Sequence, residues 1–494
     1  MRITGRLGSL ALSDDCSVDV YREEFKQILS IEGSNFAEFR YQTYDPEDEG
    51  YTGVKSAVYL AAGSLKVHFL EQPFHDMYLF VTKLAKLKTL YDAARDAAVQ
   101  KASEIERMQF EISVKTPIVV FPSDPARLPD IVTMRLGEVF ASNSFDGDTS
   151  RISASLNGLQ LASDLYYDGK LSTLKIVDDI SIVANVYQRA NIDHSQANEL
   201  PDTQVSFVFS RIRHYSHPRS QVIVKISDIK LHLTQIQYEI LVTLSQSIPR
   251  VLAGTPEGSG QAVTSASSLG QPVSTGSEAQ LSLVNLEPEI RLSPTPIGSR
   301  PWTTIDLVAS IATVKLHLYD RAATTEANLK DHGIARFALN DVSLRSKLMS
   351  HGAFEAQLVL RSFTMSNTRP GGSKFREIVP AADHERNQFM VLYTSSGASA
   401  LAVMTVDAPY IIFSVEPIFA LLSFFTSGSP GSNSSNKSAE RETTREPSTS
   451  STIDLRFELH DVSISVLEDD TDTSSQAIRL RINQILMSQQ VRVL

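Results

Sequence analysis

Along most of this 494-residue chain, apolar and polar residues alternate with a period of two. That alternation is typical of strands that cover one face and leave the other in water, as in antiparallel sheets. About twenty segments of ordinary strand length carry it. Between two of them, Tyr167 and Lys170 flank an Asp-Gly pair, which predicts a two-residue β-hairpin. We therefore predict a mainly β fold with a long antiparallel sheet.

Three helical segments are predicted between the strands. The longest runs from about Pro73 to Met108, where apolar residues recur along one stripe. A capping box at Thr234–Gln237 predicts the start of a second helix, and a short third helix is expected over Glu416–Phe425. Because each helix follows a strand at a comparable interval, the chain is predicted to repeat a unit of several strands closed by one helix.

This repetition, together with composition, predicts the domain organisation. Two segments, 253–280 and 427–452, are rich in Ser, Gly, Thr and Pro and lack apolar periodicity, so we expect flexible loops. Solvated insertions are the simpler interpretation of these loops, and phosphorylation or adaptor binding is the alternative. The predicted units are 1–109, 110–252 and 281–426, each ending in a helix, and 453–494, the start of a further unit.

A shorter signature recurs inside the strands: an apolar residue, two residues containing Gly, Asn or Asp, an apolar residue, any residue and an apolar residue. It occurs at Leu7–Leu12, Leu156–Leu161, Ile226–Leu231, Leu339–Leu344 and Leu459–Ile464. In a regular strand, a spacing of three would place the second apolar residue on the wrong face. A β-bulge at the small or polar pair keeps both halves on one face and bends the sheet. Plain hairpin turns at some of these pairs are the alternative.

Composition excludes several classes of protein. The single cysteine, Cys16, rules out an internal disulfide and a Cys-rich zinc site, and it fits a cytoplasmic location. The formal net charge of −11 lacks the basic footprint of a nucleic-acid-binding protein. No secretory signal opens the chain, and no apolar stretch is long enough to span a bilayer.

Catalytic and metal-binding motifs are also missing. His384-Glu385 lacks the second histidine of a zinc motif, and the acidic run 468–472 lacks the glycine of a calcium loop. Neither a phosphate-binding loop nor a nucleophile elbow occurs. We expect no enzyme activity, no metal and no cofactor.

Several segments, spread over most of the chain, share another feature. They are Gly5–Asp15, Ile28–Pro46, Val114–Pro122, Leu360–Met365 and Arg376–Pro380. Each resembles the vacuolar protein sorting-associated protein 13 family, the bridge-like lipid transfer proteins. The resemblance implies repeating β-groove modules, in which a long curved sheet forms an open hydrophobic groove and a helix or loop closes each module.

The implied function is that of a segment of a bridge. Such a protein conducts glycerophospholipids between organelle membranes at contact sites and supports vacuolar and Golgi protein sorting. The family's N-terminal chorein segment and C-terminal membrane-targeting parts are not visible in this sequence. We therefore interpret the chain as an internal piece of a longer bridge, with a truncated gene model as the alternative. Membranes would be met peripherally through the missing regions, adaptor proteins are further possible partners, and no nucleic acid is expected.

The groove floor is the expected site. Its candidates are the apolar residues of the alternating strands: Leu65, Val67, Phe69, Phe110, Ile112, Val114, Ile152, Leu156, Val222, Val224, Ile226, Ile305, Leu307 and Ile311. For each of them, ordinary core is the alternative. About twenty strands would give a trough ~95 Å long. The sequence leaves open whether the helices cross its mouth or pack on its rim. The competing hypothesis is a β-rich scaffold or adaptor at membranes, a packed sandwich that carries no lipid.

Overall fold

The computed structural model of the chain describes residues 1–14, 22–47, 51–76, 78–79, 107–124, 128–147, 149–167, 169–189, 220–253, 302–371, 373–382, 384, 386–396, 399–427, 451–472 and 474–493. The predicted flexible loops lie almost wholly outside these residues, so both stay predictions. The same holds for the division of the chain into units, which remains an expectation.

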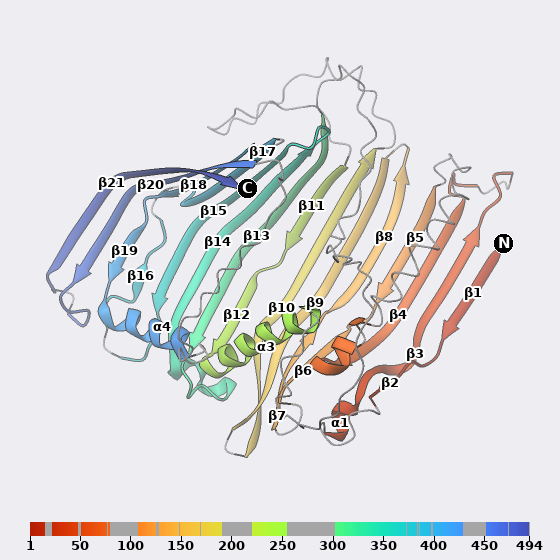
Figure 1. Ribbon diagram of the computed structural model, residues 1–494, viewed down its shortest axis with the longest axis horizontal. Coiled ribbons are helices and arrows are strands. Elements are labelled where there is room, and N and C mark those ends of the chain that lie inside the picture. The colour runs from red at the N-terminus through yellow and green to blue at the C-terminus, as the bar shows by residue number, and fades with distance from the viewer. Residues whose placement is uncertain are drawn as a thin grey trace, which may run out of the picture.

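One sheet of 21 strands dominates the described residues (Figure 1). Its strands are β1 (Arg2–Leu7), β2 (Leu12–Ser13), β3 (Gln27–Thr43), β4 (Ser56–His68), β5 (Met108–Val114), β6 (Ile118–Asp124), β7 (Leu128–Arg135), β8 (Glu138–Asp146), β9 (Thr149–Tyr167), β10 (Lys170–Arg189), β11 (Ser220–Ile226), β12 (Ile229–Thr234), β13 (Thr303–Tyr319), β14 (Gly333–Met349), β15 (Phe354–Asn367), β16 (Glu377–Val379), β17 (Phe389–Ser396), β18 (Ser399–Asp407), β19 (Tyr410–Phe413), β20 (Ser451–Leu467) and β21 (Ala477–Val493). The prediction of a mainly β fold on one large sheet is confirmed.

Helices are few among the described residues. They are α1 (Glu23–Lys26), α3 (Gln235–Ala253), the 3-10 helix η1 (Glu326–His332), α4 (Val415–Ser427) and a helical stretch over 71–76 and 78–79.

Two of the three predicted helices lie inside the described residues, and their starts are confirmed. The capping box of α3 forms as expected: the Thr234 backbone N–H donates to Gln237 Oε1 over 2.9 Å, and the Gln237 N–H donates to Thr234 Oγ1 over 3.3 Å. Helix α4 begins one residue before the predicted Glu416. Most of the predicted long helix lies outside the described residues, and its expected end, Met108, instead begins β5.

Many short strands are halves of one strand position. Strand β4, for example, pairs with β5 through Leu60 and Ile112 and with β6 through Val67 and Val119. The same end-to-end arrangement holds for β1 with β2, β8 with β7, β11 with β12, β17 with β16 and β18 with β19. Because six pairs of strands share a position, the 21 strands occupy 21 − 6 = 15 positions. At ~4.8 Å per position the sheet is roughly 70 Å long, shorter than the expected ~95 Å.

A crease divides the sheet into two halves, as oriented in Figure 1. The upper half contains β1, β5, β8, β11, β17 and β18, and the lower half contains β2, β6, β7, β12, β16 and β19; the long strands cross both halves. The crease passes through residues with left-handed backbone, at φ between 47° and 81°: Gly137, Gly158, Asp341, Ala408 and Asp461. Three of them, Gly158, Asp341 and Asp461, are the second polar residue of the recurring signature. Strands β9, β14 and β20 continue on both sides of these residues, so the hairpin-turn alternative is wrong there.

At Gly158 the predicted β-bulge is confirmed, because Leu159 and Asn157 of β9 pair with the consecutive residues Ile180 and Ser181 of β10. At Asp341 the crease has no extra residue. On both sides of Asp341, β14 keeps a one-to-one register with the continuous strands β13 and β15: the pairing skips Asp341 together with Ala312 on β13 and Arg361 on β15. At Gly137 the crease is so tight that a Cβ would lie 2.5 Å from the Asn157 carbonyl oxygen. Left-handed residues in a strand restart the alternation of side chains, which is the function that the bulges were predicted to serve.

The sheet is mixed, with parallel pairing at three places among the described strands. Strand β4 is parallel to β5 and β6, β13 is parallel to β11 and β12, and β20 is parallel to β18 and β19. All other pairings are antiparallel, and the Tyr167–Lys170 hairpin is among them. Parallel neighbours need a long crossover, because the chain has to return to the same border of the sheet. Helices α3 and α4 begin two of these crossovers along the lower border (Figure 1).

Substitutions at Asp341 test how much the left-handed backbone of the crease affects the free energy of unfolding. Replacing Asp341 by Val should lower the free energy of unfolding by about 1–2 kcal/mol, since a β-branched residue is strained at φ +53°. Asp341→Asn should change it little, because Asn tolerates left-handed backbone and loses only an exposed ion pair with Arg361. Ser343→Val, on the same exposed side of β14, is the matched control in urea unfolding. Equal effects of Asp341→Val and Ser343→Val would contradict the prediction.

Candidate functional site

An unbroken row of apolar and glycine residues crosses the entire upper half of the sheet. Residues directly opposite each other on neighbouring strands share a face. Following these pairs from β1 to β21 gives the middle row: Gly5, Phe39, Leu60, Ile112, Ala141, Ala154, Ala184, Val224, Ala309, Leu344, Leu358, Val391, Met404, Phe457 and Met487. No polar or charged side chain interrupts it.

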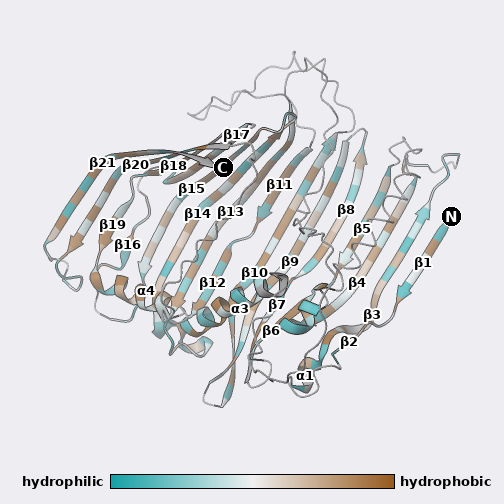
Figure 2. Ribbon diagram, in the orientation of Figure 1, coloured by the Kyte–Doolittle hydropathy of each residue, from teal (hydrophilic) through white to brown (hydrophobic). Residues whose placement is uncertain are grey.

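A second unbroken row runs beside the crease, two residues along each strand from the middle row and therefore on the same face. This crease row consists of Leu7, Ala37, Ala62, Val114, Val139, Leu156, Ile182, Ile226, Ile311, Val342, Leu360, Phe389, Val406, Leu459 and Ile485. Two adjacent rows thus make a continuous apolar strip along the length of the sheet. Figure 2 shows hydrophobic and hydrophilic residues interspersed along the strands that carry these rows.

On the other side of the middle row, again two residues along each strand, lies an outer row that is apolar with a few polar interruptions. It consists of Ile3, Tyr41, Val58, Phe110, Asn143, Ile152, Val186, Val222, Leu307, Ser346, Ala356, Tyr393, Ala402, Leu455 and Gln489. One interruption is Asn143, whose side chain accepts from the Phe110 N–H over 2.6 Å and donates to the Met108 carbonyl over 2.8 Å. It completes the backbone hydrogen bonds of β5 where strand pairing with β8 stops. Ser346 and Gln489 are further interruptions. Polarity therefore rises from the crease towards the upper border.

The opposite face of the same strands is mixed and charged. The residues between the two apolar rows include Arg6, Glu38, Lys225 and Glu458. Arg6 and Glu38 form an exposed ion pair with 3.6 Å between Nη2 and Oε1. The unbroken apolar strip is therefore confined to one face, and the other face mixes charged, polar and apolar side chains.

The lower half carries its own apolar row. From β2 to β16 this lower row consists of Leu12, Leu29, Val67, Val119, Met134, Leu161, Val177, Leu231, Leu316, Phe337, Met365 and Val379. Helices α3 and α4 cover part of it. Leu318, Ala335 and Phe424 form a buried cluster against which Leu316, Phe337 and Tyr238 pack.

The apolar rows of both halves lie on the side of the sheet that carries α3 and α4, which we call the concave face. The left-handed crease residues restart the alternation, so that the spacing of three keeps the rows on one side. The C-terminal part of the sheet also borders an open hollow of about 290 Å³, lined by Val391, Met404, Phe457 and Met487 of the middle row and by six neighbours, Ala402, Val403, Leu455, Arg456, Ser488 and Gln489. The concave face is therefore an apolar groove, with helices over its lower border.

The structure places the predicted floor residues as follows. Val114, Leu156, Ile226 and Ile311 lie in the crease row, Ile112 and Val224 in the middle row, Phe110, Ile152, Val222 and Leu307 in the outer row, Ile305 beyond it, Val67 in the lower row, Leu65 opposite Ile31 and Phe69 against the rings of Phe74 and Phe121. All of them are half-buried. Each of these residues therefore has two interpretations, as groove floor or as ordinary core.

Two groups of residues in these rows escaped the sequence analysis. The first is the set of alanines at the centre of the middle row, Ala141, Ala154, Ala184 and Ala309, which are too small to mark a strand face on their own. The second is the C-terminal continuation, for example Met404 and Phe457. The alternating pattern was present in both, but only the strand register shows that they extend the same row.

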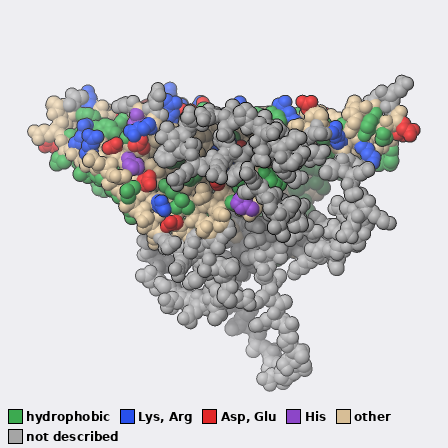
Figure 3. All heavy atoms as spheres, turned by 90° about the horizontal axis from the view of Figure 1, so that it is seen from above, with side chains coloured by type: hydrophobic (Ala, Val, Ile, Leu, Met, Phe, Trp, Pro, Cys, Tyr) green, Lys and Arg blue, Asp and Glu red, His purple; other side chains and the backbone are tan. Residues whose placement is uncertain are grey.

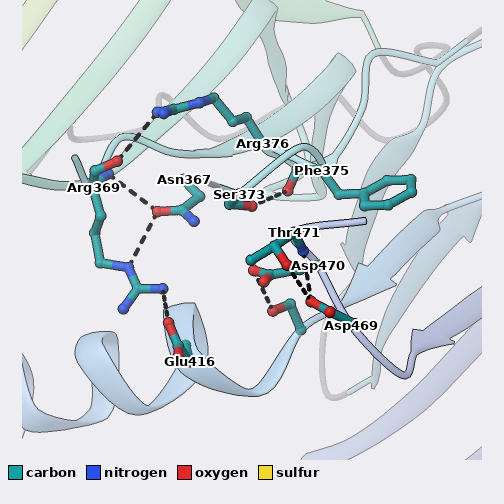
Figure 4. Close-up of polar contacts among 10 residues, drawn as sticks. Asn367, Arg369, Ser373, Phe375, Arg376, Glu416, Asp469, Asp470 and Thr471 are labelled. Carbon is teal, nitrogen blue, oxygen red and sulfur yellow. Dashed lines mark hydrogen bonds and ion pairs between the residues drawn. The ribbon is translucent and has the colours of Figure 1, made fainter. Parts of the chain in front are cut away.

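Polar contacts fix α4 at the lower border (Figure 4). Arg369 donates to Glu416 Oε2 over 3.1 Å, and the Ser414 hydroxyl donates to Asp470 Oδ2 over 3.0 Å. The Lys374 backbone N–H donates to the Asp470 carbonyl over 2.8 Å. These bonds join the β15–β16 connection, the start of α4 and the β20–β21 turn.

The acidic run 468–472 is a hydrogen-bonded turn. Thr471 donates to Asp469 and lowers its pKa, and Ser474 does the same for Asp472. Among the described residues, no group of His, Cys, Asp or Glu side chains has the arrangement of a metal site. Nor does any described helix combine the length and the hydropathy needed to cross a membrane.

The convex side of the lower half holds a stacked aromatic cluster instead of an apolar row. The rings of His232 and His317 stack 5.1 Å apart, and His232 Nδ1 lies 3.0 Å from the Tyr319 hydroxyl. Burial, with His232 and Arg336 nearby, lowers the pKa of His317 to about 4. His317 is therefore neutral at pH 7 and stacks without charge repulsion.

Replacing Phe424 tests whether the packing of α4 on the sheet contributes to the free energy of unfolding. Phe424→Ala should lower the free energy of unfolding by about 3 kcal/mol or more, because its ring is 1% exposed and leaves a cavity between helix and sheet. Phe419→Ala, on the same helix but 63% exposed, should change it by less than about 0.5 kcal/mol. Urea unfolding, with hydrogen exchange of the α4 amides, measures both. Similar losses for the two variants would show that α4 does not pack as described.

Comparisons with known proteins agree with this geometry. The curated protein "Intermembrane lipid transfer protein VPS13" from Chaetomium thermophilum (strain DSM 1495 / CBS 144.50 / IMI 039719) is 29% identical over 458 residues. The matched part covers 87% of this chain and 13% of that protein, so the chain spans a small part of that relative's length. A family model described as "VPS13-like family middle region" matches residues 9–493. As the sequence resemblance predicted, the chain belongs to the VPS13-like family.

Proposed function

We propose that this chain is a segment of a bridge-like lipid transfer protein and conducts glycerophospholipids along its concave face. The observation that carries the proposal is the middle row, which remains apolar across every strand position of the sheet. The relative named as an intermembrane lipid transfer protein supports the same assignment. In this proposal, the fourteen predicted floor residues and the remaining residues of the rows contact acyl chains.

The energetics of lipid movement explain why the row has to be continuous. Exposing a chain of about sixteen carbons to water costs on the order of 12 kcal/mol, at ~0.8 kcal/mol per CH₂. A continuous apolar floor removes most of that barrier, because the tail exchanges one apolar contact for the next. A single charged side chain in the strip would restore part of the barrier, since lipid contact would desolvate the charge. No such side chain occurs in the middle or the crease row.

The scaffold hypothesis requires the apolar face to be covered by protein. In a sandwich, a second sheet would pack about 10 Å away and bury the floor side chains. The described strands belong to one sheet, and the predicted floor residues are half-buried. Exposed apolar strips of this size mark binding surfaces in soluble proteins. These observations favour the groove over ordinary core.

We further propose that the protein is not an enzyme and acts peripherally at contacts between organelle membranes, in vacuolar and Golgi sorting. Membranes would be reached through other parts of a longer protein, and adaptors are further candidate partners. The parallel joins at β5/β6, β13 and β20 support a modular groove, in which each unit ends where a helix begins the return to the upper border.

Native mass spectrometry of the purified chain tests the lipid assignment. We expect several glycerophospholipids bound per chain, and thin-layer chromatography of the extract identifies their class. A monodisperse chain that remains lipid-free after incubation with phospholipid would support the scaffold hypothesis.

Charged floor variants test the site. Val67→Asp combined with Val224→Asp should abolish lipid loading while the chain stays folded, because each carboxylate would be desolvated by a passing tail. Val183→Asp is the control: Val183 is 40% exposed on the face opposite the middle row and should leave loading unchanged. Circular dichroism monitors the fold. Global unfolding of the double variant would indicate that these residues belong to a closed core.

A further inference from the structure

A junction in the lower half of the sheet lacks strand pairing. Strand β16 continues the position of β17, and β19 continues that of β18. In the upper half, β17 pairs with β18 along its whole length, from Phe389 with Val406 to Ser396 with Ser399. In the lower half, no backbone hydrogen bond joins β16 to β19 among the residues that the structure describes. We call this unpaired junction the seam.

The local sequence explains why pairing stops at the seam. Near the N-terminus, the corresponding junction is paired in both halves, by β5 with β8 and by β6 with β7. At the seam, β16 has only three residues, and Ile378 is an extra residue between the partners of Met365 and Ser366. Such bulges disrupt strand pairing. Pro380, which has no backbone N–H to donate, follows β16, and Pro409 precedes β19.

Side chains close the seam in place of hydrogen bonds. Ile378 and Val379 of β16 are 4% and 6% exposed. Ile411 of β19 and Leu421 of α4 pack against the buried cluster that they form. Apolar contacts are not directional, so they tolerate small displacements that would break a hydrogen bond. Because segments held by few hydrogen bonds open at a lower free energy, we expect the seam to open more easily than the paired junctions beside it.

Helix α4 crosses the seam. It follows β19, with one residue between them, on one side, and its Leu421 and Phe424 pack on strands β13 to β16 on the other side. The ion pair of Arg369 with Glu416 ties the first turn of the helix to the β15–β16 connection over 3.1 Å (Figure 4). A backbone hydrogen bond between that connection and the β20–β21 turn is a further tie. The helix is therefore attached to both sides of the seam.

We propose that the seam is a joint in the sheet and that α4 is the strap that limits its movement. When the seam opens, β16 and β19 separate in the lower half, while the ladder of β17 with β18 keeps the upper half together. The middle and crease rows lie in the upper half, so the apolar strip stays continuous when the joint moves. A groove with such a joint can change its course without interrupting this strip. The joint is a property of the fold and does not depend on the ligand that the groove carries.

Hydrogen exchange tests the strap. Leu421→Ala combined with Glu416→Gln, the strap variant, weakens the hold of α4 on the far side of the seam. Its backbone amides at 377–379 and 410–413 should exchange on the order of tenfold faster, because the seam then opens against fewer contacts. The amides of β17 and β18 should keep their rates. Leu422→Ala, which deletes the same atoms at a position 56% exposed on α4, is the matched control and should change neither set.

Distances between paired spin labels test the joint directly. All labelled chains carry Cys16→Ser. One label pair, Lys330→Cys with Glu468→Cys, lies on the two sides of the seam in the lower half, and the other, Ser343→Cys with Arg456→Cys, lies on β14 and β20 in the upper half. All four residues are exposed, and charged and hydrophobic side chains mix on the surface of the C-terminal part, on the left in Figure 3. In the strap variant, the distance distribution of the lower pair should broaden, and that of the upper pair should stay the same.

Controls separate the joint from a general loss of stability. Circular dichroism checks the fold of each variant. If the strap variant unfolds, Glu416→Gln alone replaces it and should act in the same direction by a smaller factor. Equal acceleration of exchange in the seam and in the β17–β18 ladder, or equal broadening of both label pairs, would overturn the joint. Unchanged exchange at the seam, or the same effect of Leu422→Ala, would overturn the strap. Lipid uptake is measured separately, so a chain that binds no lipid contradicts the proposed function and leaves this test intact.

Discussion

The register of strand pairing is the constraint on which the rest of this structure depends. Backbone hydrogen bonds fix which residues lie opposite each other, and a slip of one residue would turn every side chain to the other face. Because the register is kept from β1 to β21, apolar side chains from segments hundreds of residues apart meet in one row. The groove is therefore a consequence of pairing and does not require a buried core.

The crease decides where that row can go. Long strands such as β14 cross the whole sheet, and their apolar residues change from even to odd positions at Asp341. A regular strand would then be apolar on one face above and on the other face below. Left-handed backbone at Asp341 and Asp461 brings the two halves back to one side. A conformation that costs stability locally is thus what makes the concave face continuous.

The helices give the two borders of the groove different properties. Phe424 anchors α4 to Leu318 and Ala335, and the contacts of Tyr238 with Phe424 and Phe425 join α3 to α4. At the upper border, the row one step beyond the outer row contains both polar and apolar residues, for example Ser220 on β11 and Ile305 on β13.

Local pattern alone determined the strands, the capping box at Thr234 and Gln237, and the places where the alternation had to restart, because each depends on neighbours in sequence. The alternation also supplied the fourteen candidate floor residues, whose contact with lipid stays a prediction. The sequence did not determine that short strands join end to end, that the alanines of the middle row line up, or that β16 and β19 meet without pairing. Those features depend on which distant strands pair and in what register, and such long-range contacts exist only once the sheet has formed.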